Sequence, residues 1–431
     1  MKKTWLYGAI GLLVLGAAAA YSQSASVPLV TQITSTDVFQ DIVGGQPSAQ
    51  SFYAPAPLLG NYGTTQAGNN PENWLIGGDA TTNLFQRGTT GSSVTTTITY
   101  GGPDRWAYWS GTSTAMTVSQ DTTAADLRPG YKAAFKMART SGQTGVVQMC
   151  MMQEVESVNS YGFQGSTAEV DFEAITGANF SAASGNMTAY YITGTGTDQG
   201  VSTAAFNLNA GGGGSSLWTG QVNTGVVVSL GGPGTTGRYG AVFPTTATTT
   251  EVAVALCYTP VGTAGANDYV AFGNIQLVRN SAMAGVAGSA GAALNVNDTR
   301  AKAFARRSQA LETVLQQRYF YRLTETAAIT PVAPCAAVDT THTNCLVQFP
   351  VSMRIAPTMA YANGFATPTS TTQATLGACT TLAAAATVTS TVANPLNALV
   401  NCTATTVPAA GVASFLYSNA GSGLISASAE L

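Results

Sequence analysis

The chain has 431 residues, of which 45% are hydrophobic and only 9% are charged, and its formal net charge is −3 at pH 7. The apolar content excludes an intrinsically disordered polypeptide, and the length allows two or three domains with cores of their own. The low charge, with no cluster of Lys and Arg, excludes binding to nucleic acid through its phosphates.

The first residues indicate export. Two lysines precede an apolar run at residues 5–20 that ends in three alanines. This succession is typical of a secretory signal peptide, which we predict at residues 1–20. An uncleaved membrane anchor is the alternative, because the run approaches the roughly 17 residues that can span a bilayer. The expected location is extracellular, at the cell surface or in a virion.

Residues 21–71 are polar and contain Pro, Gly and Gln, with only short apolar clusters. This composition predicts an extended N-terminal arm. In an assembly, such an arm could add a strand to a neighbouring subunit or to the chain's own sheet. In a monomer it would be a loosely packed tail, and the sequence leaves both alternatives open.

Residues 72–280 carry many short strand signals separated by Gly, Asn and Ser clusters. Two short apolar signals, at residues 74–76 and 84–85, come first. The clearest strands are expected at residues 95–100, 115–119, 131–138, 146–152, 168–174, 187–192, 225–230, 252–258 and 269–278. So many strands without helical periodicity between them predict an all-β jelly-roll sandwich. Residues 232–237 match a dinucleotide-binding pattern, but no helix can follow them, so they predict a turn.

Three motifs at the start of this region occur in the order usual for one family. Residues 73–79 (NWLIGGD), 85–88 (FQRG) and 100–106 (YGGPDRW) resemble the N-L-L-I-N-G-D-F, W-Q-R-G and Y-x-x-D-R-W succession of jelly-roll domains in phage tail-fibre and other virion-associated proteins. Gly78 and Phe85 replace the family's Asn and Trp. The resemblance implies a jelly-roll domain in a virion structural or receptor-binding protein.

Three later segments resemble the same family. Residues 269–277 are similar to its closing strand, and residues 317–321 (QRYFY) are similar to its Q-R-Y-Y motif. Residues 346–358 (LVQFPVSMRIAPT) resemble its F-P-V-x-M-R-x-A-P-T segment. The resemblance therefore touches most of the chain after Asn73, while the Thr- and Ala-rich end from residue 367 lies outside it.

Two segments connect the jelly roll to the rest of the chain. Residues 281–295 are nearly all Gly, Ala, Ser and Val, which predicts a flexible linker. Residues 296–322 predict a helix, because residues 297–299 can cap it and apolar residues follow at three- and four-residue spacing. Its apolar stripe could form a short homotrimer seam, but its length favours packing within its own domain.

Residues 323–431 have few charges and short apolar segments, which predict a second, small β-sandwich domain braced by disulfides. Six cysteines in an exported chain form an even set. The proximity of Cys335 to Cys345, and of Cys379 to Cys402, predicts two local bridges. Cys150 and Cys257 either pair with each other or stay as buried thiols, and the sequence favours neither alternative.

Glu169, Asp171 and Glu173 form the most prominent polar cluster. Their alternation with apolar residues places the three carboxylates on one face of a strand, roughly 6.5 to 7 Å apart in succession. A divalent cation such as structural Ca²⁺ is one candidate ligand, and a glycosidase pair is another, because this spacing suits inverting enzymes. The simpler interpretation is a solvent-exposed sheet face opposed by Lys132 and Lys136. No other cofactor is expected.

Aromatic side chains are the candidates for glycan binding, because a flat ring can stack on a sugar. These candidates are Tyr108, Trp109, Tyr190, Tyr191 and Trp218. Trp109 and Trp218 are expected to be exposed. The single histidine, His342, sits in a Thr-rich turn without a nucleophile motif, so no catalytic residues are assigned.

The sequence thus predicts a non-enzymatic, exported virion-type structural or receptor-binding protein. Its expected partners are a surface glycan or another virion or surface protein, and it is expected to form a homo-oligomer, either a trimer or a polymer. The alternative is a secreted cell-surface or filament-forming subunit assembled through its N-terminal arm. A polysaccharide-degrading enzyme ranks third.

Overall fold

The computed structural model describes residues 73–94, 96–111, 116–200, 218–325, 330–362, 364–369, 376–379, 381–384, 393–418 and 423–430. The predicted signal peptide and N-terminal arm lie outside these residues. None of the helices in the described segments is both long and apolar enough to cross a membrane.

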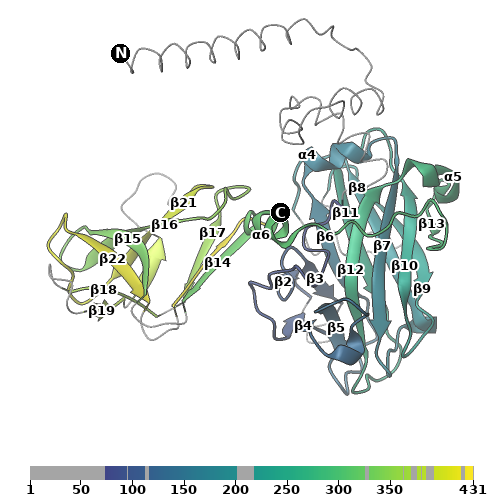
Figure 1. Cartoon of the computed structure of the whole chain (residues 1–431), viewed down its shortest axis with the longest axis horizontal. Coiled ribbons are helices and arrows are strands. Elements are labelled where there is room, and N and C mark those ends of the chain that lie inside the picture. The colour runs from purple at the N-terminus through teal and green to yellow at the C-terminus, as the bar shows by residue number, and fades with distance from the viewer. Residues whose placement is uncertain are drawn as a thin grey trace, which may run out of the picture. The chain divides into compact units, whose positions relative to one another are not determined.

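Two antiparallel sheets form the first domain, in which Figure 1 shows the long strands of one sheet packed on those of the other. The seven-stranded sheet has the order β1 (Ser92–Val94), β4 (Met116–Asp121), β5 (Ala134–Arg139), β12 (Tyr269–Arg279), β7 (Thr167–Thr176), β10 (Thr236–Pro244) and β13 (Ala292–Ala293). The six-stranded sheet has the order β2 (Thr99–Tyr100), β3 (Ala107–Ser110), β6 (Met149–Val155), β11 (Glu251–Tyr258), β8 (Asn186–Gly194) and β9 (Val222–Ser229). The chain passes repeatedly from one sheet to the other, although β2 and β3, β4 and β5, β8 and β9, and β12 and β13 are consecutive within one sheet. The predicted jelly-roll sandwich is confirmed.

The core lies between the two sheets. Alternate residues of each strand point inward, as the period of two requires, and they include the fully buried Phe135, Phe172, Phe243 and Phe272. Trp106 closes one end of this core and tilts against Phe135. Short helical turns connect the strands at η2 (Ala124–Asp126), α4 (Ser157–Ser160), η3 (Tyr161–Phe163) and η4 (Ala183–Gly185).

Most expected strand positions agree with the structure, but the start of the domain differs and three strands are not among those expected. Residues 74–76 and 84–85 form bends, turns or irregular backbone rather than strands. The side chain of Asn73 explains the first case: its Nδ2 donates to Ile275 O (3.0 Å), and its Oδ1 accepts from the Leu277 backbone N–H (3.1 Å). These side-chain bonds and a few backbone bonds, such as Trp74 N–H to Leu277 O (2.9 Å), attach this segment to β12 without a continuous strand ladder. The strands β1 (Ser92–Val94), β3 and β10 are not among those expected, and of the described residues in the expected strand 95–100 only Thr99 and Tyr100 form a strand.

The predicted flexible linker at residues 281–295 is wrong. This segment forms η5 (Ser281–Met283), α5 (Ala284–Ala287) and β13, which pairs with β10. Its small residues allow a close approach to the sheet, where Met283 and Leu294 pack on Val242. Burial of these apolar side chains holds the segment in place.

The predicted helix at residues 296–322 is also too long. The observed helix, α6, spans Gln309–Gln317 and is capped by Ser308, whose side chain accepts a hydrogen bond from the Leu311 N–H. Residues 302–308, here called the connector, are extended. Their backbone donates to the sheet instead of to a helix: Lys302 N–H bonds Glu169 (2.9 Å) and Ala305 N–H bonds Gln276 (3.0 Å).

The C-terminal domain is a second β structure with its own core. A three-stranded sheet has the order β14 (Phe320–Glu325), β23 (Gly423–Ser428) and β17 (Thr358–Ala362). A seven-stranded sheet has the order β19 (Leu376–Ala378), β18 (Phe365–Pro368), β22 (Ala413–Ser418), β15 (Pro331–Ala337), β16 (His342–Gln348), β21 (Asn397–Thr403) and β20 (Thr381–Ala384). A buried cluster that includes Phe349, Phe365 and Leu416 supports both sheets.

Three disulfides stabilise the structure, one within the jelly-roll domain and two within the C-terminal domain. Cys335–Cys345 and Cys379–Cys402 form the predicted local bridges in the C-terminal domain. Cys150 and Cys257 are bonded to each other, which resolves the alternative that the sequence left open. They are register partners on β6 and β11 and are fully buried.

Candidate functional site

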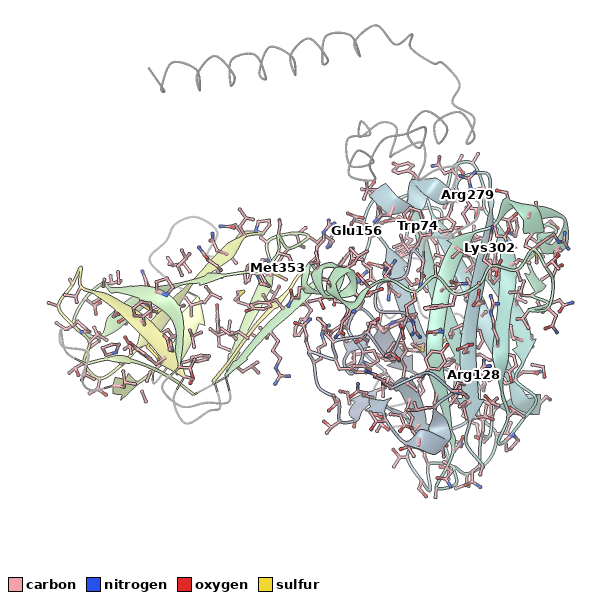
Figure 2. All side chains as sticks on the ribbon, in the orientation of Figure 1. Trp74, Arg128, Glu156, Arg279, Lys302 and Met353 are labelled. Atoms are coloured by element: carbon pink, nitrogen blue, oxygen red, sulfur yellow. A yellow bond between two sulfur atoms is a disulfide. The ribbon has the colours of Figure 1, made fainter. Side chains whose placement is uncertain are left out.

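The three predicted carboxylates do share the outer face of β7, but this face is not open. Glu169 and Asp171 are 0% and 1% exposed. Asp171 receives hydrogen bonds from Arg238 (Nε 3.2 Å, Nη2 2.9 Å) and from Gln276 (2.6 Å). Glu169 is held by Asn280 and by the connector backbone at Lys302, which Figure 2 labels. Burial raises the pKa of both carboxyl groups above their ordinary values.

This arrangement bears on the metal-binding, glycosidase and solvent-face interpretations of the three carboxylates. The described residues contain no group of three or more acidic, Cys or His side chains suited to a metal ion. Every oxygen of Glu169 and Asp171 is already hydrogen-bonded, so neither is presented to a substrate. The solvent-face interpretation is wrong for these two residues, because the connector covers them. Lys136 does not oppose them either, since it pairs with Asp121 (2.7 Å) and Asp126 (3.0 Å).

The prediction that aromatic side chains form an exposed glycan-binding surface is also wrong. Tyr108, Trp109, Tyr191 and Trp218 are all buried, and Tyr190 is half-buried. Trp109 and Trp218 belong to a small apolar cluster with the Cys150–Cys257 bridge on the outer face of the six-stranded sheet. The alternation of side chains predicts that a position faces outward but does not reveal whether other segments cover it, so the sequence predicts exposure where the structure shows burial.

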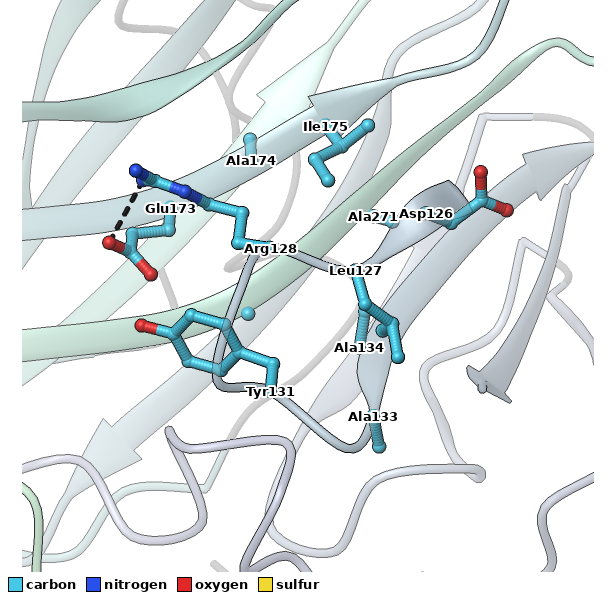
Figure 3. Close-up of a pocket in the computed structure, with 11 residues that line it drawn as sticks. Asp126, Leu127, Arg128, Tyr131, Ala133, Ala134, Glu173, Ala174, Ile175 and Ala271 are labelled. Atoms are coloured by element: carbon cyan, nitrogen blue, oxygen red, sulfur yellow. Dashed lines mark hydrogen bonds and ion pairs between the residues drawn. The ribbon is translucent and has the colours of Figure 1, made fainter. Parts of the chain in front are cut away.

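The third carboxylate, Glu173, lies where the outer sheet face remains accessible. Figure 3 shows a shallow recess beside it, between β7, β12 and the loop that follows η2. Small or apolar side chains line the recess, among them Leu127, Ala134, Ile175, Ala271 and Gly273. Its volume is about 10 Å³, close to the least that holds one water molecule.

Polar groups form one rim of this recess. Arg128 points toward Glu173 and bonds it at 2.9 Å (Figure 3). The two side chains are 32% and 17% exposed, so solvent reaches both. The Tyr131 ring forms a wall of the recess, and its hydroxyl accepts a hydrogen bond from Asn274. The Arg306 guanidinium lies 5.5 Å from the centre of this ring. Burial raises the pKa of Tyr131, and its hydrogen bond to Glu173 raises it further.

A bulge in β12 creates this geometry. The pairing of β12 with β7 shifts register between Phe272 and Ile275, and Gly273 and Asn274 occupy the irregularity. Bulges redirect side chains and are common next to functional sites. Asn274 is buried and donates to Glu173 (3.3 Å) as well as to Tyr131. The isolated Gly273 within a strand was the one sequence signal for the bulge, and nothing in the sequence indicated Arg128 or Tyr131.

The motif residues that carry the family resemblance gather elsewhere, where the first domain contacts the C-terminal domain. Arg87 lies over the Phe320 ring and Arg105 over the Tyr319 ring, each at 3.6 Å from the ring centre. Both guanidinium groups also bind the carboxylate of Glu430. We call Arg87, Arg105, Tyr319, Phe320, Arg354 and Glu430 the joint.

Further hydrogen bonds connect residues in and around the joint. Arg354 donates to the backbone oxygens of Ala429 and Glu430, each at 3.1 Å. On the side of the first domain, Gln316 of α6 accepts from the Leu84 N–H (2.9 Å), and Glu312 accepts from the Gly77 N–H (2.9 Å). The charged motif positions therefore hold two domains together.

One buried carboxyl group next to the joint has no hydrogen-bond partner within the described segments. Both oxygens of Glu154 are unpartnered, and the residue is 3% exposed. Its backbone oxygen accepts from Arg105 (2.9 Å). Burial raises the pKa of Glu154 to about 8, although the positive charge of Arg105 opposes this shift.

Glu154 makes stability depend on pH. Between the ordinary Glu pKa of about 4.5 and about 8, the unfolded chain loses this proton while the folded chain keeps it, so stability falls as pH rises. We expect Glu154→Gln to match wild type near pH 4 and to exceed it by at least about 1 kcal/mol at pH 8. Urea unfolding at the two pH values measures this. An equal difference between the proteins at both pH values would contradict it.

The fold defines the class: an all-β protein with a jelly-roll sandwich followed by a second β domain. No protein-family model matches the chain, and no curated protein does. Among solved structures, it is similar to the enzymatically active domain of tailspike protein 4 of bacteriophage CBA120, with 11% identity, a TM-score of 0.28, and coverage of 48% of this chain and 21% of that one.

Two further solved structures are similar to the chain. An exo-β-agarase has 10% identity and a TM-score of 0.25, with coverage of 48% of this chain and 25% of that one. A carbohydrate esterase from Shiga toxin-encoding bacteriophage phi24B has 15% identity and a TM-score of 0.22, with coverage of 44% of this chain and all of that one. Each of these matches covers less than half of this chain and has a low TM-score.

Proposed function

We propose that the protein is a non-enzymatic, exported structural and receptor-binding subunit of virion type. The joint is the observation that carries this proposal. The motifs that resemble those of virion-associated proteins supply the buried arginines and aromatic rings that join one β domain to the next. In this proposal these positions serve mechanical coupling rather than chemistry, because their charges are paired with one another and their rings are packed.

The surface composition supports a receptor made of glycan. Few charges are available, so contacts must come from hydroxyl, amide and single aromatic groups, which suit sugars. Binding at such shallow surfaces is individually weak. A homo-oligomer would strengthen it, since linked sites raise the effective concentration of ligand.

A second function, a filament-forming subunit, is favoured by the edge strand β9. Val222 and Val227 on this strand are 56% and 58% exposed, and residues 221–229 contain no charge and no proline. Edge strands without such protection accept an added strand from another chain. The predicted N-terminal arm would supply that strand.

One experiment separates the two functions. The full-length protein is purified from its native source, imaged by negative-stain microscopy and applied to a glycan array. We expect discrete oligomers that bind at least one glycan and release no sugar from it. Long polymers without glycan binding would favour the filament function, and release of sugar would overturn the non-enzymatic assignment.

A further inference from the structure

The recess beside Glu173 is small and has an apolar interior. Its floor comes from small residues on neighbouring strands, Ala134 of β5 and Ala271 and Gly273 of β12, and Leu127 and Ile175 close its sides. A volume of about 10 Å³ admits one group of about the size of a water molecule. A sugar ring cannot enter, and a hydroxyl group would leave its hydrogen bonds unmade on this floor.

The rim supplies a donor and an acceptor for an amide. Arg128 has five N–H donors and uses one on Glu173 among the residues that the structure describes. The Glu173 carboxylate accepts from Arg128, Asn274 and the Tyr131 hydroxyl, and since a carboxylate has about four acceptor positions, room is left for a further hydrogen bond. Both groups are partly exposed, and Asn274 and Arg128 hold the carboxylate in place before any ligand arrives.

We infer that this recess binds the acetamido group of an N-acetylated sugar, an inference that rests on the proposed glycan-binding function. The methyl group fills the apolar recess, the amide N–H donates to Glu173, and the carbonyl oxygen accepts from Arg128. The Tyr131 ring forms the adjoining wall. An O-acetyl group would satisfy the recess and Arg128 but would leave Glu173 without a donor.

The test uses saturation-transfer NMR and titration of the full-length protein with four methyl glycosides: those of N-acetylglucosamine, N-acetylgalactosamine, glucose and galactose. We expect the strongest saturation transfer at the acetyl methyl group, and affinity at least about tenfold higher for an acetylated sugar than for its parent. Equal affinity for acetylated and parent sugars would overturn the inference.

Two variants locate the binding. The Cβ of Gly273→Ala would lie 3.6 Å from the Tyr131 ring and 3.8 Å from the Glu173 carboxylate, ordinary contact distances, so the variant fills the recess without a clash. We expect it to lose at least about tenfold in affinity for the acetylated sugar. Gly285→Ala is the matched control, because its Cβ meets nothing within 4 Å. Arg128→Gln, a change at a partly exposed site, should lose about fivefold or more.

The outcomes distinguish this inference from the proposed function. If no glycan on the array is bound, glycan recognition itself fails. If glycans are bound but Gly273→Ala and Arg128→Gln bind them as wild type does, the protein binds sugars elsewhere and only the recess assignment fails. Should Gly273→Ala not fold, Arg128→Gln and the acetyl-methyl signal decide.

Discussion

Arg105→Ala is expected to lower the free energy of unfolding by about 3–5 kcal/mol, because it removes one of the two arginines that bind the Glu430 carboxylate and leaves that carboxylate short of positive charge. Arg105 is 2% exposed, and its guanidinium binds Glu430, packs on Tyr319 and donates to Glu154 O. It also adopts a positive φ of 72°, which an arginine tolerates only where its surroundings hold it. Guanidinium unfolding of the full-length protein measures the loss.

The control for this change is Arg300→Ala. Arg300 and Asp298 form an ion pair on the surface, with side-chain exposures of 46% and 19%, so its removal should leave the unfolding midpoint unchanged. The double variant Arg105→Ala/Glu430→Ala should lose less than the sum of the single variants, because the two residues are coupled. An unfolding midpoint of Arg105→Ala equal to that of wild type would show that the joint does not stabilise the protein.

Removal of the Cys150–Cys257 bridge is the second large expected effect. The bridge closes a sequence separation of 107 residues, against 10 for Cys335–Cys345. A cross-link that closes the longer loop restricts the unfolded chain more, so the Ala/Ala variants should lose about 5 and about 3 kcal/mol respectively.

The two pairs are well matched for comparison. Both join register partners on adjacent antiparallel strands, so loop length is the main difference between them. Thermal unfolding of each variant against wild type gives the two losses. A loss for Cys335→Ala/Cys345→Ala as large as that for Cys150→Ala/Cys257→Ala would contradict the chain-entropy explanation.

The residues of the joint show which contacts sequence motifs can predict and which they cannot. The sequence marks Arg87, Arg105 and the Tyr319–Phe320 pair through their place in recognisable segments, yet the two arginines lie more than two hundred positions from the two rings in the chain. Glu430 lies in no motif at all. Its role follows only from the contacts it makes with the two arginines.

By itself, the sequence determined the local features of this protein. Period-two alternation positioned most strands of the sandwich and placed Glu169, Asp171 and Glu173 on one face, and cysteine spacing predicted the two short-range bridges. Only the tertiary structure decided which faces are covered. The connector buries Glu169 and Asp171, the cluster around the Cys150–Cys257 bridge buries Trp218, and the bulge of β12 brings Asn274 to Glu173. Local spacing sets the direction of a side chain, whereas its exposure depends on distant segments that pack over it.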